Sequence, residues 1–258
     1  MSNQDGKLKK AAELIFRSSR TVAFTGAGIS VESGIPPFRG KDGLWSKYDP
    51  VCLDIDQFNH NPNESWPLIK EIFYDFFGAA RPNEAHYSLH SLEQAGYLHS
   101  IITQNIDNLH QEAGSTAVYE FHGNSRELVC RSCLKHYNTK DIFLANLPPR
   151  CPVCGSVLKP NFVFFGEPIP EPVNANSFRE ALLADVFIII GTTGEIMPAS
   201  LIPYEAKKND KKIIEINVAP SNYTPTITDI FLEGKAATIV PKLAKAVMII
   251  AQSIHKLD

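Results

Sequence analysis

The segment Thr21–Gly40, TVAFTGAGISVESGIPPFRG, decides the fold of this chain. Its first five residues form a compact apolar run, which predicts a buried strand of a parallel sheet. The run ends in Gly26-Ala27-Gly28, where glycine allows a sharp turn and the close approach of an anionic ligand. Gly34 lies too far along the chain for the G-x-G-x-x-G dinucleotide pattern. Taken alone, the loop therefore also fits a strand-to-helix turn without a ligand.

A rigid arm follows the glycine loop. Pro36 and Pro37 fix two φ angles and remove two N–H donors, so Phe38 and Arg39 lie on stiff backbone. An aromatic ring and a guanidinium beside an anion-binding loop favour ligand contact over an ordinary surface charge.

Composition excludes several classes of protein. The 258 residues carry 25 basic and 28 acidic side chains, a net charge of -3, which argues against nucleic acid as a partner. The N-terminus has no apolar signal region, and apolar runs such as Val186–Ile190 are far shorter than a membrane span. These features, with cysteines that fit a reducing compartment, predict a cytoplasmic protein without a membrane partner.

Further strands and helices predict an α/β fold. Apolar residues at helical spacing predict a helix over residues 7–18 ahead of the first strand, and Pro241 is expected to open a C-terminal helix. The strands expected after the first are Ser100–Gln104, Val118–His122, Asp185–Gly191, Lys212–Asn217 and Ala237–Val240. This alternation predicts a doubly wound parallel sheet.

Polar residues follow the predicted strands at their carboxyl ends, where ligands bind in open α/β sheets. The run Gln104-Asn105-Ile106-Asp107-Asn108 follows one strand, and Thr192-Thr193 and Asn217 follow two others. Such groups suit a carboxamide or a ribose, although one of them could simply cap a helix. His122, beside Gly123 and just after a strand, is a candidate general base.

Four cysteines have the spacing of a structural zinc site. Cys130-x-x-Cys133 and Cys151-x-x-Cys154 match the pattern of two knuckles in a zinc ribbon. Four thiolates complete a tetrahedral site and leave no open position for catalysis. Cys52 stands apart and is expected to be a plain buried thiol.

Three other stretches are open to more than one interpretation. Residues 41–81 are rich in aromatics and prolines, which predicts a mobile loop and short helices that act as a lid. His86 and His90 lie four apart on a predicted helix, but without the glutamate of an H-E-x-x-H motif we expect packed histidines. The extended segment Lys159–Glu167 either pairs with a peptide at its edge or belongs to the core.

Taken together, the motifs resemble the sirtuins, the NAD-dependent protein-lysine deacylases. The shared motifs are GAGISVESGIPPFRG, TQNIDNLH, FHGN, the two cysteine pairs, NFVFFGE, GTTGEIMPAS and IEIN, in the same order and spacing over nearly the whole chain. The resemblance implies a Rossmann-type domain of residues 1–40, 86–125 and 160–258. It also implies a small domain of residues 41–85 and 126–159, which combines a helical module with the zinc ribbon.

The resemblance also implies roles for single residues. Its NAD-binding positions are Ala27, Gly28, Phe38, Arg39, Gln104, Asn105, Ile106, Asp107, Thr192, Thr193, Asn217 and Ala236. An acyl-lysine peptide is expected to lie as a strand between Val163, Phe164, Phe165, Gly166 and Glu167 on one side and Gly194, Glu195 and Ile196 on the other.

The implied reaction consumes NAD. In sirtuins the acyl oxygen attacks the ribose C1′ as nicotinamide leaves, which gives an alkylimidate. By position, His122 is the general base on a ribose hydroxyl, and the products are free lysine and O-acyl-ADP-ribose. The zinc is structural.

At three places the chain differs from sirtuin motifs in ways that bear on cofactor or substrate binding. Pro37 replaces the usual Asp or Thr and removes a polar contact near the nicotinamide pocket, so a different affinity for NAD or a different base-exchange balance is expected. Gly194-Glu195 replaces a leucine-led sequence, and the negative charge of Glu195 suggests basic residues flanking the acyl-lysine. Lys70 and Phe73 stand where sirtuins that remove acidic acyl groups have tyrosine and arginine, so neutral acyl groups are expected. Two alternatives remain: a protein mono-ADP-ribosyltransferase on the same fold, and a non-enzymatic zinc-ribbon module that senses NAD.

Overall fold

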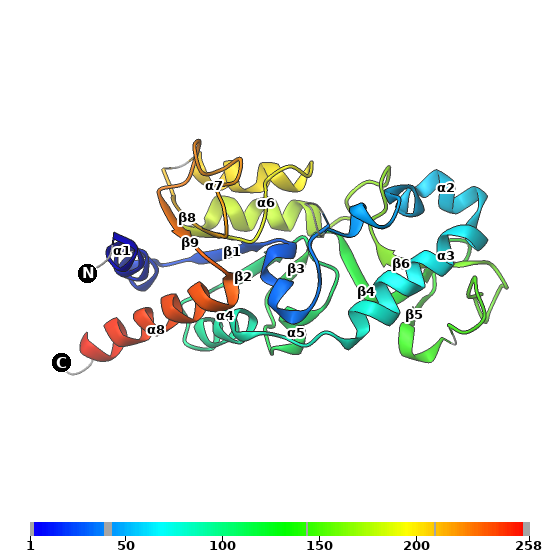
Figure 1. Ribbon diagram of the computed structural model, residues 1–258, viewed down its shortest axis with the longest axis horizontal. Coiled ribbons are helices and arrows are strands. Elements are labelled where there is room, and N and C mark those ends of the chain that lie inside the picture. Colours follow the sequence, from blue (N-terminus) through cyan, green and yellow to red (C-terminus); the bar gives the residue numbers. More distant parts are fainter. Residues whose placement is uncertain (1–2, 39–42, 143, 209, 255–258) are drawn as a thin grey trace.

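The larger of two sheets is parallel and six-stranded. The computed structural model describes residues 3–38, 43–142, 144–208 and 210–254 (Figure 1). The strands are β1 (Thr21–Thr25), β2 (Ser100–Thr103), β3 (Val118–Glu120), β7 (Val186–Ile190), β8 (Lys212–Asn217) and β9 (Ile230–Glu233). Their order is β3-β2-β1-β7-β8-β9, with every pairing parallel. This is the Rossmann order, and its switch point lies between β1 and β7. The predicted doubly wound fold is confirmed.

Helices cover both faces of this sheet (Figure 1). One face carries α1 (Asn3–Arg17), α4 (Glu84–Gln94) and α8 (Ala236–Ile254), and the other carries α6 (Val173–Leu183) and α7 (Ile202–Lys207). Successive side chains of a strand point to opposite faces. Accordingly, Ala23 joins the cluster under α1, α4 and α8, while Val22 and Phe24 join the cluster under α6 and α7.

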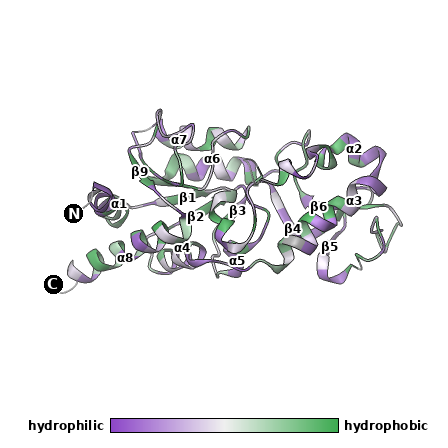
Figure 2. Ribbon diagram, viewed as in Figure 1, coloured by the Kyte–Doolittle hydropathy of each residue, from purple (hydrophilic) through white to green (hydrophobic). Residues whose placement is uncertain are grey.

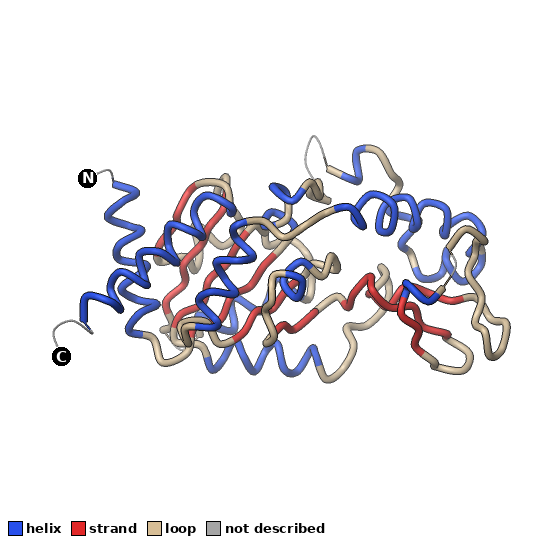
Figure 3. Tube along the Cα trace, turned by 90° about the horizontal axis from the view of Figure 1, so that it is seen from below, coloured by secondary structure: helices blue, strands red, loops and turns tan. Residues whose placement is uncertain are grey.

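The second sheet is small and antiparallel. Its strands are β4 (Gly123–Cys130), β5 (His136–Asn138) and β6 (Leu158–Phe162), in the order β5-β4-β6. Helices α2 (Ile55–His60) and α3 (Pro62–Lys70), with further helical turns over Glu71–Ala79, lie along it (Figure 3). The Trp66 indole N–H donates to the Leu158 carbonyl at 2.9 Å, and both residues are fully buried. The helical module and the ribbon therefore share one core.

The predicted last strand is wrong. Residues 237–240 lie in α8, which begins at Ala236 and contains Pro241 in its interior, and the last strand is β9. A short apolar run has no periodicity that separates a strand from a helix. Here the buried residues follow a helical spacing, which explains why the segment is a helix: they are Ile239, Val240, Leu243 and Val247.

The sequence predicts no apolar segment of membrane-spanning length, but helix α8 is long and apolar enough to be a candidate. Within the described residues, Ala236–Ser253 has 18 residues with a mean hydropathy of 1.2, enough by length and composition to span a membrane. A core helix passes the same test, and α8 packs against α1 and α4. Figure 2 shows both hydrophobic and hydrophilic stretches along it. The absence of a membrane partner stays a prediction.

The small sheet crosses the domain boundaries expected from sequence. Strand β4 begins at Gly123, before the expected boundary at 125/126, and β6 ends at Phe162, after the boundary at 159/160. The division into residues 1–40, 86–125 and 160–258 against 41–85 and 126–159 stays a prediction at the level of single residues.

Candidate active site

A cleft of about 570 Å³ lies between the two sheets, at the carboxyl ends of the parallel strands. Gly26, Ala27 and Gly28 line it after β1, and Gln104, Asn105 and Ile106 line it after β2. Thr192 and Thr193 follow β7, and Asn217 ends β8. The far wall comes from the small domain and from residues 162–167. The topology therefore gathers the predicted strand-end residues at one place.

The loops after β1 and β7 touch each other at two glycines. The Gly28 N–H donates to the Gly191 carbonyl at 2.8 Å, and Gly191 has φ +63°. A Cβ atom on Gly28 would lie 2.6 Å from the Gly191 Cα, which is closer than such atoms approach. Both positions therefore need glycine for the loops to come this close.

Buried amides and hydroxyls hold the floor of the cleft. The Asn105 side-chain NH₂ donates to the Gly26 carbonyl and to Ser30 Oγ, each at 3.2 Å. Ser30 Oγ in turn donates to Asp107 at 2.7 Å. Burial raises the pKa of Asp107, although hydrogen bonds from Ser30 and the Leu109 N–H favour its charged form. This network fixes the glycine loop to the segment after β2.

A second group of polar contacts joins β2, β7 and β8. Gln104 Nε2 donates to Thr192 Oγ1 at 3.1 Å, and Asn217 Nδ2 donates to the Thr192 carbonyl at 3.0 Å. Three neighbouring strand ends thus present side-chain amides and hydroxyls along one edge, a surface suited to ribose hydroxyls and phosphate oxygens.

His122 has the geometry of a base. Its Nδ1 lies 3.0 Å from the Gln104 carbonyl, which can only accept, so Nδ1 carries the proton and Nε2 keeps a free lone pair. His122 lines the cleft, and burial lowers the pKa of its ring. The side chain is therefore neutral at neutral pH and able to accept a proton.

Aromatic and aliphatic side chains form the wall opposite the glycine loop. The Phe73 ring lies 5.0 Å from the Phe162 ring, which stacks on Phe164 at 5.3 Å. All three rings line the cleft with Leu53 and Trp45. This wall can take an apolar chain but offers no charge to an acidic group.

Most predicted site residues line the cleft. Among the predicted cofactor and substrate positions they are Ala27, Gly28, Phe38, Gln104, Asn105, Ile106, Thr192, Thr193, Asn217, Ala236, Val163, Phe164, Phe165, Gly166, Glu167 and Ile196. Of the described residues, Asp107, Gly194 and Glu195 are not in the lining. Asp107 lies behind Asn105 through Ser30, and Gly194 lies against the Tyr223 ring. Arg39 lies outside the described residues.

Sequence reasoning missed part of the lining. Trp45, Leu53 and Phe73 come from the small domain, and the aromatic richness of residues 41–81 was the signal for Trp45 and Phe73. Phe162 comes from the extended segment Lys159–Glu167. Gly234 and Lys235 were missed because the segment after them was expected to be a strand rather than a helix.

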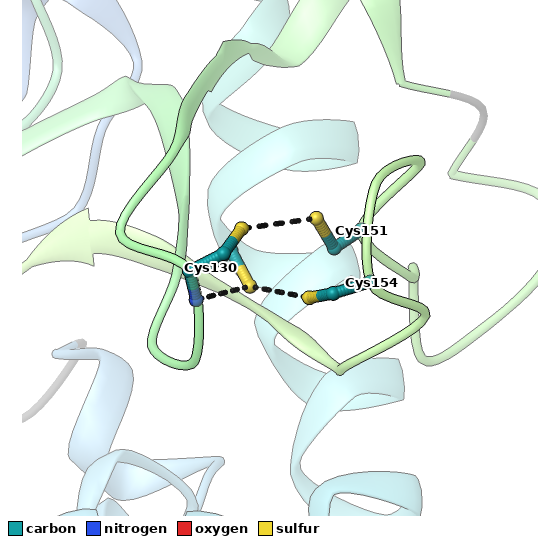
Figure 4. Close-up of side chains that lie close together, drawn as sticks. Cys130, Cys151 and Cys154 are labelled. Atoms are coloured by element: carbon teal, nitrogen blue, oxygen red, sulfur yellow. Dashed lines mark hydrogen bonds between the residues drawn. The ribbon is translucent and has the colours of Figure 1, made fainter.

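The four predicted metal ligands are brought together. The Sγ atoms of Cys130, Cys133, Cys151 and Cys154 all lie within 4.8 Å of one another. A zinc ion with four thiolates needs S···S separations of about 3.8 Å, and the Cys130–Cys154 and Cys133–Cys151 pairs lie at 3.4 and 3.6 Å. Figure 4 shows Cys130, Cys151 and Cys154 gathered between the two loops that carry them. The residues fit a structural zinc ion.

The remaining candidate residues have structural surroundings. His86 is buried on α4, and its ring lies 4.9 Å from the ring of His110. His90 contacts Gly114, and Cys52 is buried in the core of the small domain. Within the described part of the chain, the cysteine cluster is the one group of three or more side chains placed to hold a metal ion.

A cleft at the switch point of a parallel sheet, walled by a second domain, places this chain among two-domain dinucleotide-binding proteins. A model of the Sir2 family matches residues 26–198. The chain is 44% identical to an NAD-dependent protein deacylase of Pyrococcus furiosus, over 93% of this chain and 98% of that protein. It therefore belongs to the Sir2 family, as the motifs suggested.

Solved structures agree with this assignment. A Sir2 homologue in complex with NAD has a TM-score of 0.86 and 39% identity, with 94% of each chain covered. A Sir2 protein with a p53 peptide and NAD⁺ has a TM-score of 0.84 and 34% identity, with 95% of this chain and 99% of that chain covered.

The cysteine geometry predicts one zinc ion per purified chain, measured by plasma mass spectrometry. Cys133→Ser removes one of four ligands and should lower both the zinc content and the melting temperature, because metal binding contributes to the folding of such ribbons. Cys52→Ala is the control and should keep the zinc. Full zinc occupancy in the Cys133→Ser protein would contradict the assignment.

Proposed function

We propose that this chain is an NAD-dependent protein-lysine deacylase. The observation that carries the proposal is the placement of His122: its Nδ1 is held by the Gln104 carbonyl, and its own carbonyl accepts from the Val163 N–H at 2.9 Å. The same residue thus joins the strand-end amides of the cofactor side to the segment expected to receive a peptide. Relatives named NAD-dependent deacylases and deacetylases support this choice.

Different residues of the cleft would bind the cofactor and transfer the proton. Gly26–Gly28 and the hydroxyls and amides of Thr192 and Asn217 would bind the dinucleotide. Asn105 and Ile106 would contact its nicotinamide, and Asp107 would hold Asn105 in place through Ser30. When bound, NAD supplies an electrophilic ribose carbon with nicotinamide as the leaving group. His122 Nε2 takes the proton of a ribose hydroxyl, and the Nδ1–H bond to Gln104 stabilises the imidazolium that results.

A peptide would enter along residues 163–167. The Phe165 N–H donates to the Leu53 carbonyl at 2.8 Å, and its own carbonyl accepts from the Ile55 N–H at 3.0 Å. The Phe165 backbone is therefore bonded to the small domain and the Phe164 backbone to Glu167, so a peptide strand would pair with other backbone groups of the segment, toward Ile196 and Met197. Strand addition of this kind gives affinity through main-chain hydrogen bonds.

The acyl group would lie against the aromatic wall. Phe73 is buried and lines the cleft, whereas the Lys70 ammonium lies 2.6 Å from Asp75 in a partly exposed ion pair. Neither residue offers a free cation to an acidic acyl group. We therefore propose acetyl and other neutral acyl-lysines as substrates. A cytoplasmic location and the absence of nucleic-acid partners stay predictions from sequence.

The experiment that tests the function is mass spectrometry of the products from NAD and matched acetyl-lysine and succinyl-lysine peptides. We expect equal amounts of nicotinamide, free lysine peptide and O-acetyl-ADP-ribose, with slower release of succinyl groups. His122→Ala should lower the rate about 10²-fold or more, the usual contribution of a general base. Labelled ADP-ribose on protein that survives His122→Ala would favour the ADP-ribosyltransferase. NAD binding with no turnover at all would favour the sensing module.

The protonation of His122 predicts the acid side of the pH profile. The reactive form is neutral, and burial lowers its pKa from 6.5, so activity lost on acidification should have its midpoint below pH 6.5. The measurement is kcat/KM for the acetyl peptide from pH 5 to 8, with zinc content checked at each end. A midpoint above pH 6.5 would contradict the buried, neutral histidine.

A further inference from the structure

Lys159 is a buried cation outside the proposed chemistry. It lies on β6, and only 4% of its surface is exposed. Its side chain packs against the segment 162–167. A lysine is almost never buried this fully unless its charge is paired. Burial lowers the pKa of its ammonium, and the charge of Glu167 opposes that shift.

The three N–H donors of this ammonium have three acceptors. Nζ lies 2.6 Å from the Phe162 carbonyl, 3.1 Å from the Pro160 carbonyl and 2.8 Å from Glu167 Oε2. Nζ also lies 4.1 Å from the centre of the Phe164 ring, within cation–π range. One side chain thus contacts both ends of the segment 162–167 and the aromatic ring between them.

Glu167 closes the turn from the other end. The same oxygen that bonds Lys159 accepts from the Phe164 N–H at 2.8 Å, and the Glu167 N–H donates to the Phe164 carbonyl at 3.0 Å. Gly166 between them has φ +86°. The turn is therefore shaped by a carboxylate whose counter-ion is Lys159.

We propose that Lys159 is a positioning residue for the peptide substrate, which holds the 163–167 edge in the shape that receives an acyl-lysine strand. It acts through Glu167 and the Phe162 carbonyl, and it is not among the residues that line the cleft. Its loss would therefore weaken peptide binding and leave dinucleotide binding unchanged. The proposal rests on the deacylase function but concerns a residue that touches neither substrate.

The test compares Lys159→Met, Lys159→Arg and Lys159→Met/Glu167→Gln with the wild-type protein. Lys159→Met removes the ammonium donor from two carbonyls and the counter-ion from the Glu167 carboxylate, so we expect the KM for an acetyl-lysine peptide to rise about tenfold. The KM for NAD, ADP-ribose binding by calorimetry, kcat at saturating peptide and zinc content should change less than twofold. Lys207→Met is the matched control, because Lys207, at the end of α7, pairs with Asp229 just before β9 at 2.7 Å and does not line the cleft.

The other variants separate positioning from general loss of structure. Lys159→Arg keeps the charge and should restore most of the peptide affinity, and the double variant should recover part of it because no carboxylate is left unpaired. Peptide KM within twofold of wild type for Lys159→Met, or equal losses for peptide and ADP-ribose, would overturn the proposal. A wild-type protein that releases no lysine peptide would instead contradict the proposed function, while ADP-ribose binding still reports on the fold.

Discussion

The contact between Gly28 and Gly191 is the constraint on which the site depends. It is made where β1 and β7 diverge, and it is possible because neither residue carries a side chain. On either side of this contact, hydrogen bonds hold the two loops. Asn105 and Ser30 hold the loop after β1, and Gln104 and Asn217 hold the loop after β7. The cofactor side of the cleft is thus a set of loops tied to one another across four strand ends.

The second domain is joined to this frame at His122. Its backbone continues from β3 into β4, its ring is bonded to the segment after β2, and its carbonyl holds Val163. The ribbon, the helical module and the peptide-facing segment share one core, with Trp66, Phe162 and Phe164 among its buried members. A structural zinc site in this core would act on the chemistry indirectly, by keeping β4 and β6 in place.

Much of this arrangement could be predicted from the sequence, because several signals are local. The glycine loop, the amides after strands and the paired cysteines can each be recognised from a few neighbouring residues. The run at residues 236–240 cannot be assigned in this way, because its helical state depends on packing against α1 and α4. The roles of Phe73 and Trp45 in the cleft likewise depend on how two domains meet, and the contacts of Lys159 depend on a turn formed further along the chain.

The role of the Gly28–Gly191 contact is tested most directly by calorimetric titration of ADP-ribose into the Gly28→Ala protein. Gly6→Ala on α1 is the control, because it adds a methyl group in open space. A Cβ at Gly28 would displace the loop after β7 at a cost of about 1–3 kcal/mol. We expect a lower melting temperature and weakened ADP-ribose binding, with zinc content unchanged because the ribbon lies in the other domain. Wild-type affinity and stability in Gly28→Ala would contradict the claim that this contact builds the cleft.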